Sequence, residues 1–186
     1  AHTAGRRGST DELFLRDIPA GSLNASVRDL ARFASMVLGG GELDGARVLA
    51  PDSLARMLEP QNEGVELDFG FRIGLSFFLT NPALEYAGRF CGHGGDTIFH
   101  HASLQILPDQ GLAAVVLTNT TTGGAVAGKV ATRALELAVE AKTGLRPPPD
   151  SVPPAPPGAA GPGELERFAG EYMTPLGYAK LARSGN

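Results

Sequence analysis

The stretch SLQILPDQGLAAVVLTN, Ser103 to Asn119, sets the architecture of the chain. Two runs of β-forming residues, SLQIL and LAAVVLTN, are separated by the four residues Pro108 to Gly111. Proline followed by Asp, Gln and Gly has the chemistry of a type I turn closed by a glycine, so the two runs are predicted to form an antiparallel hairpin. The run VVL lacks polar alternation and is predicted to be covered on both faces.

A long helix is predicted directly after this hairpin. Residues 124–143, GAVAGKVATRALELAVEAKT, return to a helical period, and apolar residues fill all but one stripe of the helix. The polar stripe consists of Lys129, Arg133, Glu136 and Glu140. Gly144 is predicted to end the helix.

Two shorter helices are predicted upstream. Residues 26–38, SVRDLARFASMVL, begin with a Ser26 and Asp29 pair that resembles a capping box, and three glycines follow the last residue. The second helix begins at Pro51, and Pro60 ends it. The predicted apolar face of the first helix contains Val27, Leu30, Ala31, Ala34, Val37 and Leu38.

Composition narrows the classes of function. The chain has 186 residues, 42% of them hydrophobic, which is enough to bury the core of one ordinary domain. Its net charge is −4, and no basic cluster extends beyond Arg6 and Arg7, so no nucleic-acid or anionic-membrane partner is predicted. Cys91 is the single cysteine, which excludes an internal disulfide and a cysteine-based metal cage. No run of about 18 apolar residues predicts a membrane span.

The proline content divides the chain. Eight of the fourteen prolines fall between Pro147 and Pro162, and this composition favours an extended linker over a packed core. The predicted organisation is therefore a main domain over 1–145, a linker over 146–163, and the start of a small β-rich domain over 164–186. The last segment is too short to fold alone.

The stretch GHGGDT, Gly92 to Thr97, is the candidate functional site. Glycines in a strand mark a place where another backbone or a ligand approaches closely. The alternative is a partly buried His93 whose ring is satisfied by backbone groups. A zinc site joining His93 to His100 or His101 is a weaker alternative, because adjacent residues of a strand point to opposite faces and no further His or Glu pair completes the set. No metal or cofactor is predicted.

A complete nucleophile site is absent from the sequence. There is no Gly-x-Ser-x-Gly elbow, Ser-x-x-Lys pair, Tyr-x-Asn or His-Glu-x-x-His motif, and no glycine-rich phosphate loop. None of the three lysines has a serine three residues before it.

Taken in order, four segments of the chain strongly resemble the C-terminal half of the beta-lactamase-related serine hydrolases. The segments are PAGSLNASVRDLARFASMVLGGGELDGARVLAPDSLARMLEPQ, FGFRIGLSF, GHGGDT and LQILPDQGLAAVVLTN, and the resemblance covers roughly Pro19 to Leu145. The family includes class C beta-lactamases, penicillin-binding proteins, DD-peptidases and esterases. ELERFAGEY, after the linker, resembles the start of the small β-rich domain that many members carry.

The resemblance implies an α/β fold of the α+β type, a partial beta-lactamase/transpeptidase-like fold in which helices flank an antiparallel sheet. Strands are then expected near 69–79, 89–95, 103–107 and 112–119. The helix over 124–143 is expected to cover one sheet face, and the two upstream helices to belong to a neighbouring helical region. An exposed apolar face or an unpaired edge is also expected, because the family's N-terminal strands would lie outside this chain.

The resemblance also implies roles for residues of GHGGDT. His93, Gly94 and Gly95 match the family's Lys-Thr-Gly or His-x-Gly triplet. His93 would help to hold the hydroxyl and lysine network and to bind a polar group of the substrate, and Gly95 would let the substrate lie against the strand. The backbone N–H of Asp96 would contribute to the oxyanion hole.

Two further residues are candidates for substrate binding by position, Thr97 and His101. The Asp96 side chain departs from the family pattern, because a carboxylate aimed inward would oppose a developing oxyanion. A larger departure is that Ser-x-x-Lys would have to lie upstream of Ala1.

The sequence therefore predicts part of a serine hydrolase that cleaves a small-molecule amide or ester, or a peptide, through an acyl-enzyme. This chain alone is expected to be inactive and to need the N-terminal half of the same protein. The alternative is a non-catalytic module that binds a peptide or cell-wall fragment. Beta-lactams, D-amino peptides and small esters all fit the resemblance, which favours a periplasmic or secreted location without fixing one.

Overall fold

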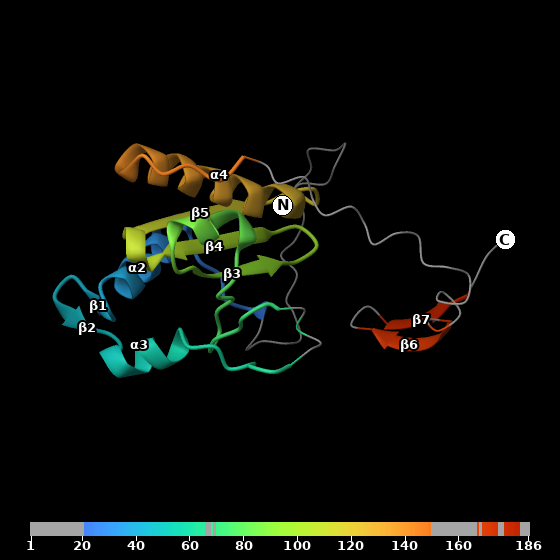
Figure 1. Ribbon diagram of the computed structural model, residues 1–186. Coiled ribbons are helices and arrows are strands. Elements are labelled where there is room, and N and C mark those ends of the chain that lie inside the picture. Colours follow the sequence, from blue (N-terminus) through green and yellow to red (C-terminus); the bar gives the residue numbers. More distant parts are fainter. Residues whose placement is uncertain are drawn as a thin grey trace. The chain divides into compact units, whose positions relative to one another are not determined.

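The computed structural model describes residues 21–65, 68, 70–149, 167, 169–174 and 177–182. The chain divides into two compact units, Ala1–Pro147 and Pro148–Asn186 (Figure 1). In the second unit, the described residues form an antiparallel hairpin of β6 (Gly170–Thr174) and β7 (Gly177–Leu181). Most of the predicted linker lies outside the described residues.

The first unit is built on a three-stranded antiparallel sheet. Its strands are β3 (Cys91–Asp96), β4 (His101–Leu107) and β5 (Leu112–Thr118), in the order β3-β4-β5. The 3₁₀ turn η3 (Pro108–Gln110) joins β4 to β5, and Gly111 closes it with φ 61°. The predicted hairpin is confirmed.

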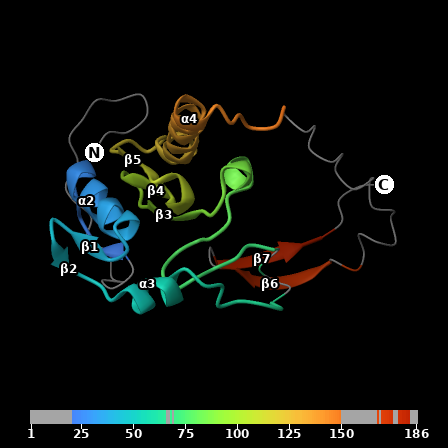
Figure 2. The same ribbon diagram turned by 60° about the vertical axis from the view of Figure 1, so that its left-hand side comes forward.

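Helices cover both faces of this sheet (Figure 2). α4 (Gly124–Thr143) packs on one face and buries every fourth residue: Ala127, Ala131, Leu135 and Val139. α2 (Val27–Leu38) packs on the other face, where its residues Ala34, Met36 and Val37 join Leu104 and Ile106 in one apolar cluster. The predicted extent and position of α4 are confirmed.

α2 was expected to belong to a helical region that neighbours the sheet, and in the structure it packs directly on one sheet face. Its predicted apolar face is only partly correct: Val27 and Ala31 are exposed, whereas Met36 is buried. Val115 to Leu117 in β5 are half-buried and so less covered than predicted. The reason is that β5 is an edge strand of the described sheet, with β4 as its one neighbour there.

Local chemistry accounts for the ends of the upstream elements. The Ser26 hydroxyl accepts from the Asp29 N–H at 3.2 Å and the Asp29 carboxylate accepts from the Ser26 N–H at 3.0 Å, so the capping box is confirmed. α3 (Pro51–Met57) begins at the predicted proline. Between the two helices, β1 (Glu42–Leu43) and β2 (Ala46–Arg47) form a small hairpin whose turn residues, Asp44 and Gly45, both have positive φ.

The strand expected over 69–79 is not formed by the described residues of that segment. They make only two isolated bridges, Ile73 with Phe78 and Phe78 with Gly92. The run folds back on itself because the Gly74 N–H donates to the Phe77 carbonyl and Ser76 takes φ 62°. The short 3₁₀ helix η2 (Pro82–Ala87) follows and leads into β3. Among the described residues, no helix is long and apolar enough to cross a membrane.

Candidate active-site strand

β3 carries the candidate site and has an open edge. Gly92 exchanges both backbone hydrogen bonds with Phe78, at 2.8 and 2.9 Å, so its N–H and C=O point away from β4. Backbone groups alternate in direction along a strand, so those of Gly94 and Asp96 point to the same side. No described strand lies beyond β3 on this side. The amides of Gly94 and Asp96 therefore face the open edge.

Gly94 and Gly95 are not required by the packing of the chain. A Cβ on Gly94 would lie 3.5 Å from the Ala102 carbonyl oxygen, and a Cβ on Gly95 would lie 3.7 Å from the Ala102 Cβ. Both are ordinary contacts, and neither residue has a positive φ. By contrast, a Cβ on Gly92 would lie 2.5 Å from the Leu104 carbonyl oxygen. The fold explains the first glycine and leaves the other two without a structural cause.

His93 is exposed on the sheet face that α2 covers, since it pairs with Leu104 and follows the buried Cys91 by two residues. Its Nδ1 is hydrogen-bonded to the Gly94 carbonyl. A carbonyl only accepts, so Nδ1 carries a proton. In the neutral ring this leaves the lone pair on Nε2. The ring also lies against Phe78, with centroids 5.5 Å apart.

The Asp96 side chain lies on the opposite face, beside α4. Its carboxylate pairs with Nδ1 of His101, the residue directly across the β3–β4 ladder. The carboxylate is therefore turned away from the face that presents His93. The unfavourable case, an acidic group aimed at a developing oxyanion, does not arise on the His93 face.

Thr97 begins the turn between β3 and β4. Its hydroxyl accepts from the His100 N–H at 2.9 Å, and its own N–H donates to the His100 carbonyl at 2.8 Å. The side chain predicted to bind substrate is thus already used to close the turn.

His101 is not brought together with His93. It lies on the α4 face with its side chain 10% exposed, whereas His93 lies on the α2 face. The structure therefore separates His101 from the rest of the predicted substrate-binding group. The same separation prevents these two histidines from forming a metal pair.

Sequence reasoning missed the Asp96–His101 pair. The signal was available, because a four-residue turn over 97–100 places the residues on either side of it directly opposite each other.

Cys91 is a buried core residue, as predicted, and burial raises the pKa of its thiol to about 11. It is unsuited to act as a nucleophile.

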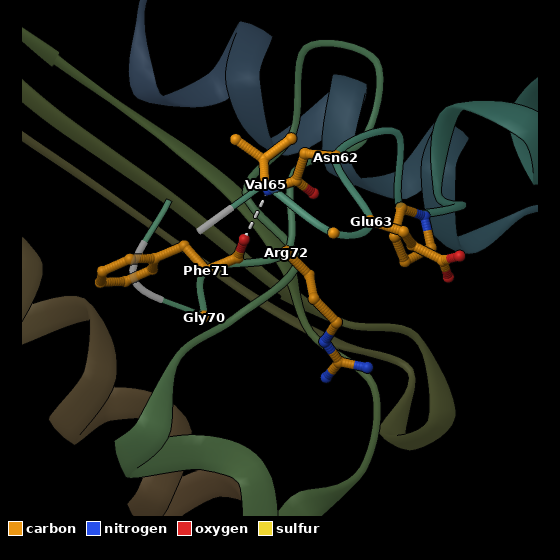
Figure 3. Close-up of a pocket in the computed structure, with 8 residues that line it drawn as sticks. Asn62, Glu63, Val65, Gly70, Phe71 and Arg72 are labelled. Carbon is orange, nitrogen blue, oxygen red and sulfur yellow. Dashed lines mark hydrogen bonds between the residues drawn. The ribbon is translucent and has the colours of Figure 1, made fainter. Parts of the chain in front are cut away.

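A surface pocket lies in the segment before β3 (Figure 3). The side-chain amide of Asn62 donates to the Phe71 carbonyl at 2.7 Å across it, and the Arg72 side chain extends away from Asn62. No residue of β3 lines this pocket, which is formed by Pro60, Asn62, Glu63, Gly64, Val65, Gly70, Phe71 and Arg72. It lacks a histidine, serine or cysteine and offers no catalytic group to complement the strand.

Comparison with known proteins gives one finding. The family model described as Beta-lactamase matches residues 1–139, which includes α2, α3 and nearly all of the sheet-and-helix unit. A comparison with curated proteins gives no significant match.

Proposed function

This chain belongs to the Beta-lactamase family, a group of beta-lactamase-related serine hydrolases, and on that basis we propose that β3 is the substrate-binding strand of an acyl-transfer site. The substrate is an amide or ester: a beta-lactam, a D-amino peptide or a small ester. The proposed site consists of the His93 side chain, Gly94, Gly95 and the backbone N–H of Asp96.

One observation carries this proposal: the two glycines of β3 that packing does not require lie beside outward-facing amides on an open strand edge. A side chain at either position would narrow the approach to that edge. Such an edge suits a substrate that binds as an added strand, with backbone hydrogen bonds from Gly94.

The chemistry of the edge fits acyl transfer. The tetrahedral intermediate of that reaction carries an oxyanion, which backbone N–H groups stabilise when they are oriented in advance. The Asp96 N–H faces the open side and is assigned this role. When the His93 ring is neutral, its Nε2 holds a lone pair. This nitrogen can then accept a proton or hydrogen bond from a hydroxyl that lies on the α2 face of β3.

The nucleophile is proposed to come from a segment outside these 186 residues. No serine of the sequence is followed by lysine at the third position after it. The chain alone is therefore expected to be inactive, whereas the native polypeptide that carries it is expected to be an enzyme. The hairpin of β6 and β7 is proposed to begin a small β-rich domain.

A fluorophosphonate, which reacts with activated serines, tests this function. The native polypeptide is analysed by intact-mass spectrometry before and after treatment. A mass above 19.3 kDa with one adduct, mapped to a serine outside this sequence, supports the proposal. A native mass of 19.3 kDa without an adduct contradicts it.

A second candidate function is supported by the absence of a nucleophile motif: a module that binds an extended peptide or cell-wall fragment along the same edge. It predicts no adduct, together with saturable calorimetric binding of a peptide ending in D-Ala-D-Ala. Substitution of Gly95 by valine would weaken that binding, because the side chain would block the edge.

A further inference from the structure

The Asp96–His101 pair is a meeting point of four elements. Asp96 ends β3 and His101 begins β4, while Thr118 of β5 is the register partner of His101 on its other side. The first residues of α4 close the site. The pair therefore lies where the sheet, the turn over 97–100 and the start of α4 come together.

Two glycines at the start of α4 make room for this pair. A Cβ on Gly123 would lie 1.8 Å from the Thr118 hydroxyl and 3.1 Å from the His101 ring. A Cβ on Gly124 would lie 2.9 Å from His101 Nδ1 and 3.1 Å from the Asp96 carboxylate. Gly124 lies in the first turn of α4, where glycine is a poor helix former, so its use there is explained by the pair. Gly123, the N-cap residue, is required chiefly by Thr118. The positive end of α4 also favours the carboxylate.

The imidazole of His101 has one hydrogen-bond partner among the described residues, and that partner is Asp96. Its Nε2 is buried and unpartnered there, as is the nearby Thr118 hydroxyl. A carboxylate accepts, so the proton lies on Nδ1 and is directed at Asp96. The His101 side chain is thus nine-tenths buried, and its one polar contact is with Asp96, the last residue of β3.

Asp96 is the last residue of the β3–β4 ladder, and its own backbone groups make no hydrogen bond to β4. Its own N–H and C=O point to the open edge, so the nearest ladder hydrogen bonds belong to its neighbours, as when the Thr97 N–H donates to the His100 carbonyl at 2.8 Å. The preceding Gly94 and Gly95 allow more backbone freedom than other residues. Asp96 and His101 face each other as a non-hydrogen-bonded pair, the kind in which the side chains approach most closely. A side-chain contact across the two strands is therefore available to hold Asp96 in place.

We propose that His101 is a positioning residue for the reaction. Through the Asp96 carboxylate it holds the Asp96 N–H in the direction that the oxyanion requires, without touching the substrate. This inference rests on the proposed function and assigns His101 a role other than the substrate binding expected from its place in the sequence. It also gives the departure from the family pattern, an acidic residue at 96, a use.

Two variants of nearly identical shape test the inference in the native polypeptide. His101→Asn keeps an N–H donor close to the place of Nδ1, and His101→Leu removes it. Initial rates are measured with p-nitrophenyl acetate and a chromogenic cephalosporin. We expect kcat to fall by about 10- to 100-fold in His101→Leu with KM within about threefold, because only transition-state stabilisation is lost. His101→Asn is expected to recover most of kcat.

The neighbouring His100 supplies matched controls, since it is exposed and its side chain makes no hydrogen bond or ion pair with the described residues. His100→Asn and His100→Leu should both retain the wild-type kcat. Thermal unfolding is followed for all four variants, so that loss of fold is distinguished from loss of positioning.

Three outcomes overturn the inference. Equal kcat in His101→Leu and wild type would show that Asp96 needs no support from His101. Equal loss in His101→Leu and a stably folded His101→Asn would show that the donor is irrelevant. A native polypeptide that hydrolyses neither substrate and takes up no fluorophosphonate would overturn the proposed function as well, which separates that failure from the first two.

Discussion

Three glycines of β3 differ in what surrounds them. Gly92 is buried, and a Cβ there would approach the Phe90 ring to 2.8 Å as well as the Leu104 carbonyl. Gly94 and Gly95 are exposed and have room for a methyl group. Packing therefore requires glycine at position 92, whereas access to the open edge is the role proposed for Gly94 and Gly95.

Alanine substitutions separate these two roles. Gly92→Ala is expected to lower the free energy of unfolding by about 1–3 kcal/mol, because the backbone has to shift. Gly94→Ala and Gly95→Ala should change it by at most about 1 kcal/mol in either direction. We expect the latter two to slow fluorophosphonate labelling of the native polypeptide, and denaturant unfolding provides the comparison. Unchanged labelling in both would mean that the glycines do not serve access.

A second residue-scale feature ties the turn after β4 to the start of β3. The Asp109 carboxylate accepts from the Arg89 side chain at 2.6 and 2.8 Å and from the Arg89 N–H at 2.8 Å. These bonds hold the pKa of Asp109 below its usual range. The bonds from the guanidinium have the larger effect on the pKa, and the bond from the backbone N–H has the smaller one. Its contribution to stability is therefore present above the unfolded pKa of about 3.9 and is lost as the pH falls through the lower folded value.

The pH dependence of Asp109→Asn tests this contact. The variant should be less stable than wild type by a constant amount from about pH 5 to 8, and the difference should shrink below about pH 4 as the wild-type carboxyl is protonated. Urea unfolding at a series of pH values measures the difference. A gap that stays the same down to about pH 2.5 would contradict the assignment.

At the scale of elements, turn chemistry decided which predictions succeeded. Pro108 and Gly111 mark the β4–β5 turn, and Gly144 marks the end of α4 with φ 75°, so both were predictable from local residue preferences. The segment 69–79 was not, because its fold-back at Ser76 places a non-glycine residue at positive φ, which residue preferences disfavour. The pairing of Phe78 with Gly92 is a tertiary contact that local preferences do not encode.

A buried polar network joins β4 to α4 and is a further element-scale feature. Gln105 is 7% exposed; its amide donates to the Ser103 hydroxyl and the Gly128 carbonyl, each at 3.2 Å, and accepts from the Thr132 hydroxyl at 3.0 Å. Replacement of Gln105 alone would leave buried groups unpaired.

Gln105→Leu is expected to cost about 1–3 kcal/mol of unfolding free energy. Thr132→Val in the same background should cost less than it does in wild type, because its partner is already lost. A double-mutant cycle measured by denaturant unfolding gives the coupling, and strictly additive effects would contradict the network.

At the scale of the whole molecule, the sheet between α2 and α4 holds Cys91 inside the larger apolar cluster. Cys91 is 1% exposed, and burial raises the pKa of its thiol to about 11. The reactive thiolate is therefore both scarce and inaccessible near neutral pH. Cys91 can thus report on the opening of this unit as a whole.

We expect Cys91 in the native polypeptide to resist alkylation by iodoacetamide at pH 8 and to react fully in guanidinium chloride. Peptide mass spectrometry quantifies the modified fraction at this position over time. Rapid, complete alkylation under native conditions would mean that the core around β3 opens freely.

The arrangement of the whole site was predictable only in part. Family resemblance pointed to β3, and the structure adds its open edge and outward amides, while the roles of its residues stay predictions. The positions of Thr97 and His101 depend on the turn over 97–100 and on the direction of the pleat, which put one hydroxyl into the turn and one imidazole on the opposite face. The pattern of residue types does not carry that information.

The most direct test of the central claim is a crystal structure of the native polypeptide with a phosphonate bound covalently to its serine, in which the phosphonate oxygen imitates the oxyanion. We predict that this oxygen lies about 2.7–3.1 Å from the backbone nitrogen of Asp96. The rest of the inhibitor should follow the open edge of β3 past Gly95. An adduct whose oxygen is held by other donors, with the Asp96 N–H out of hydrogen-bonding range, would contradict the assignment of β3 as the acyl-transfer strand.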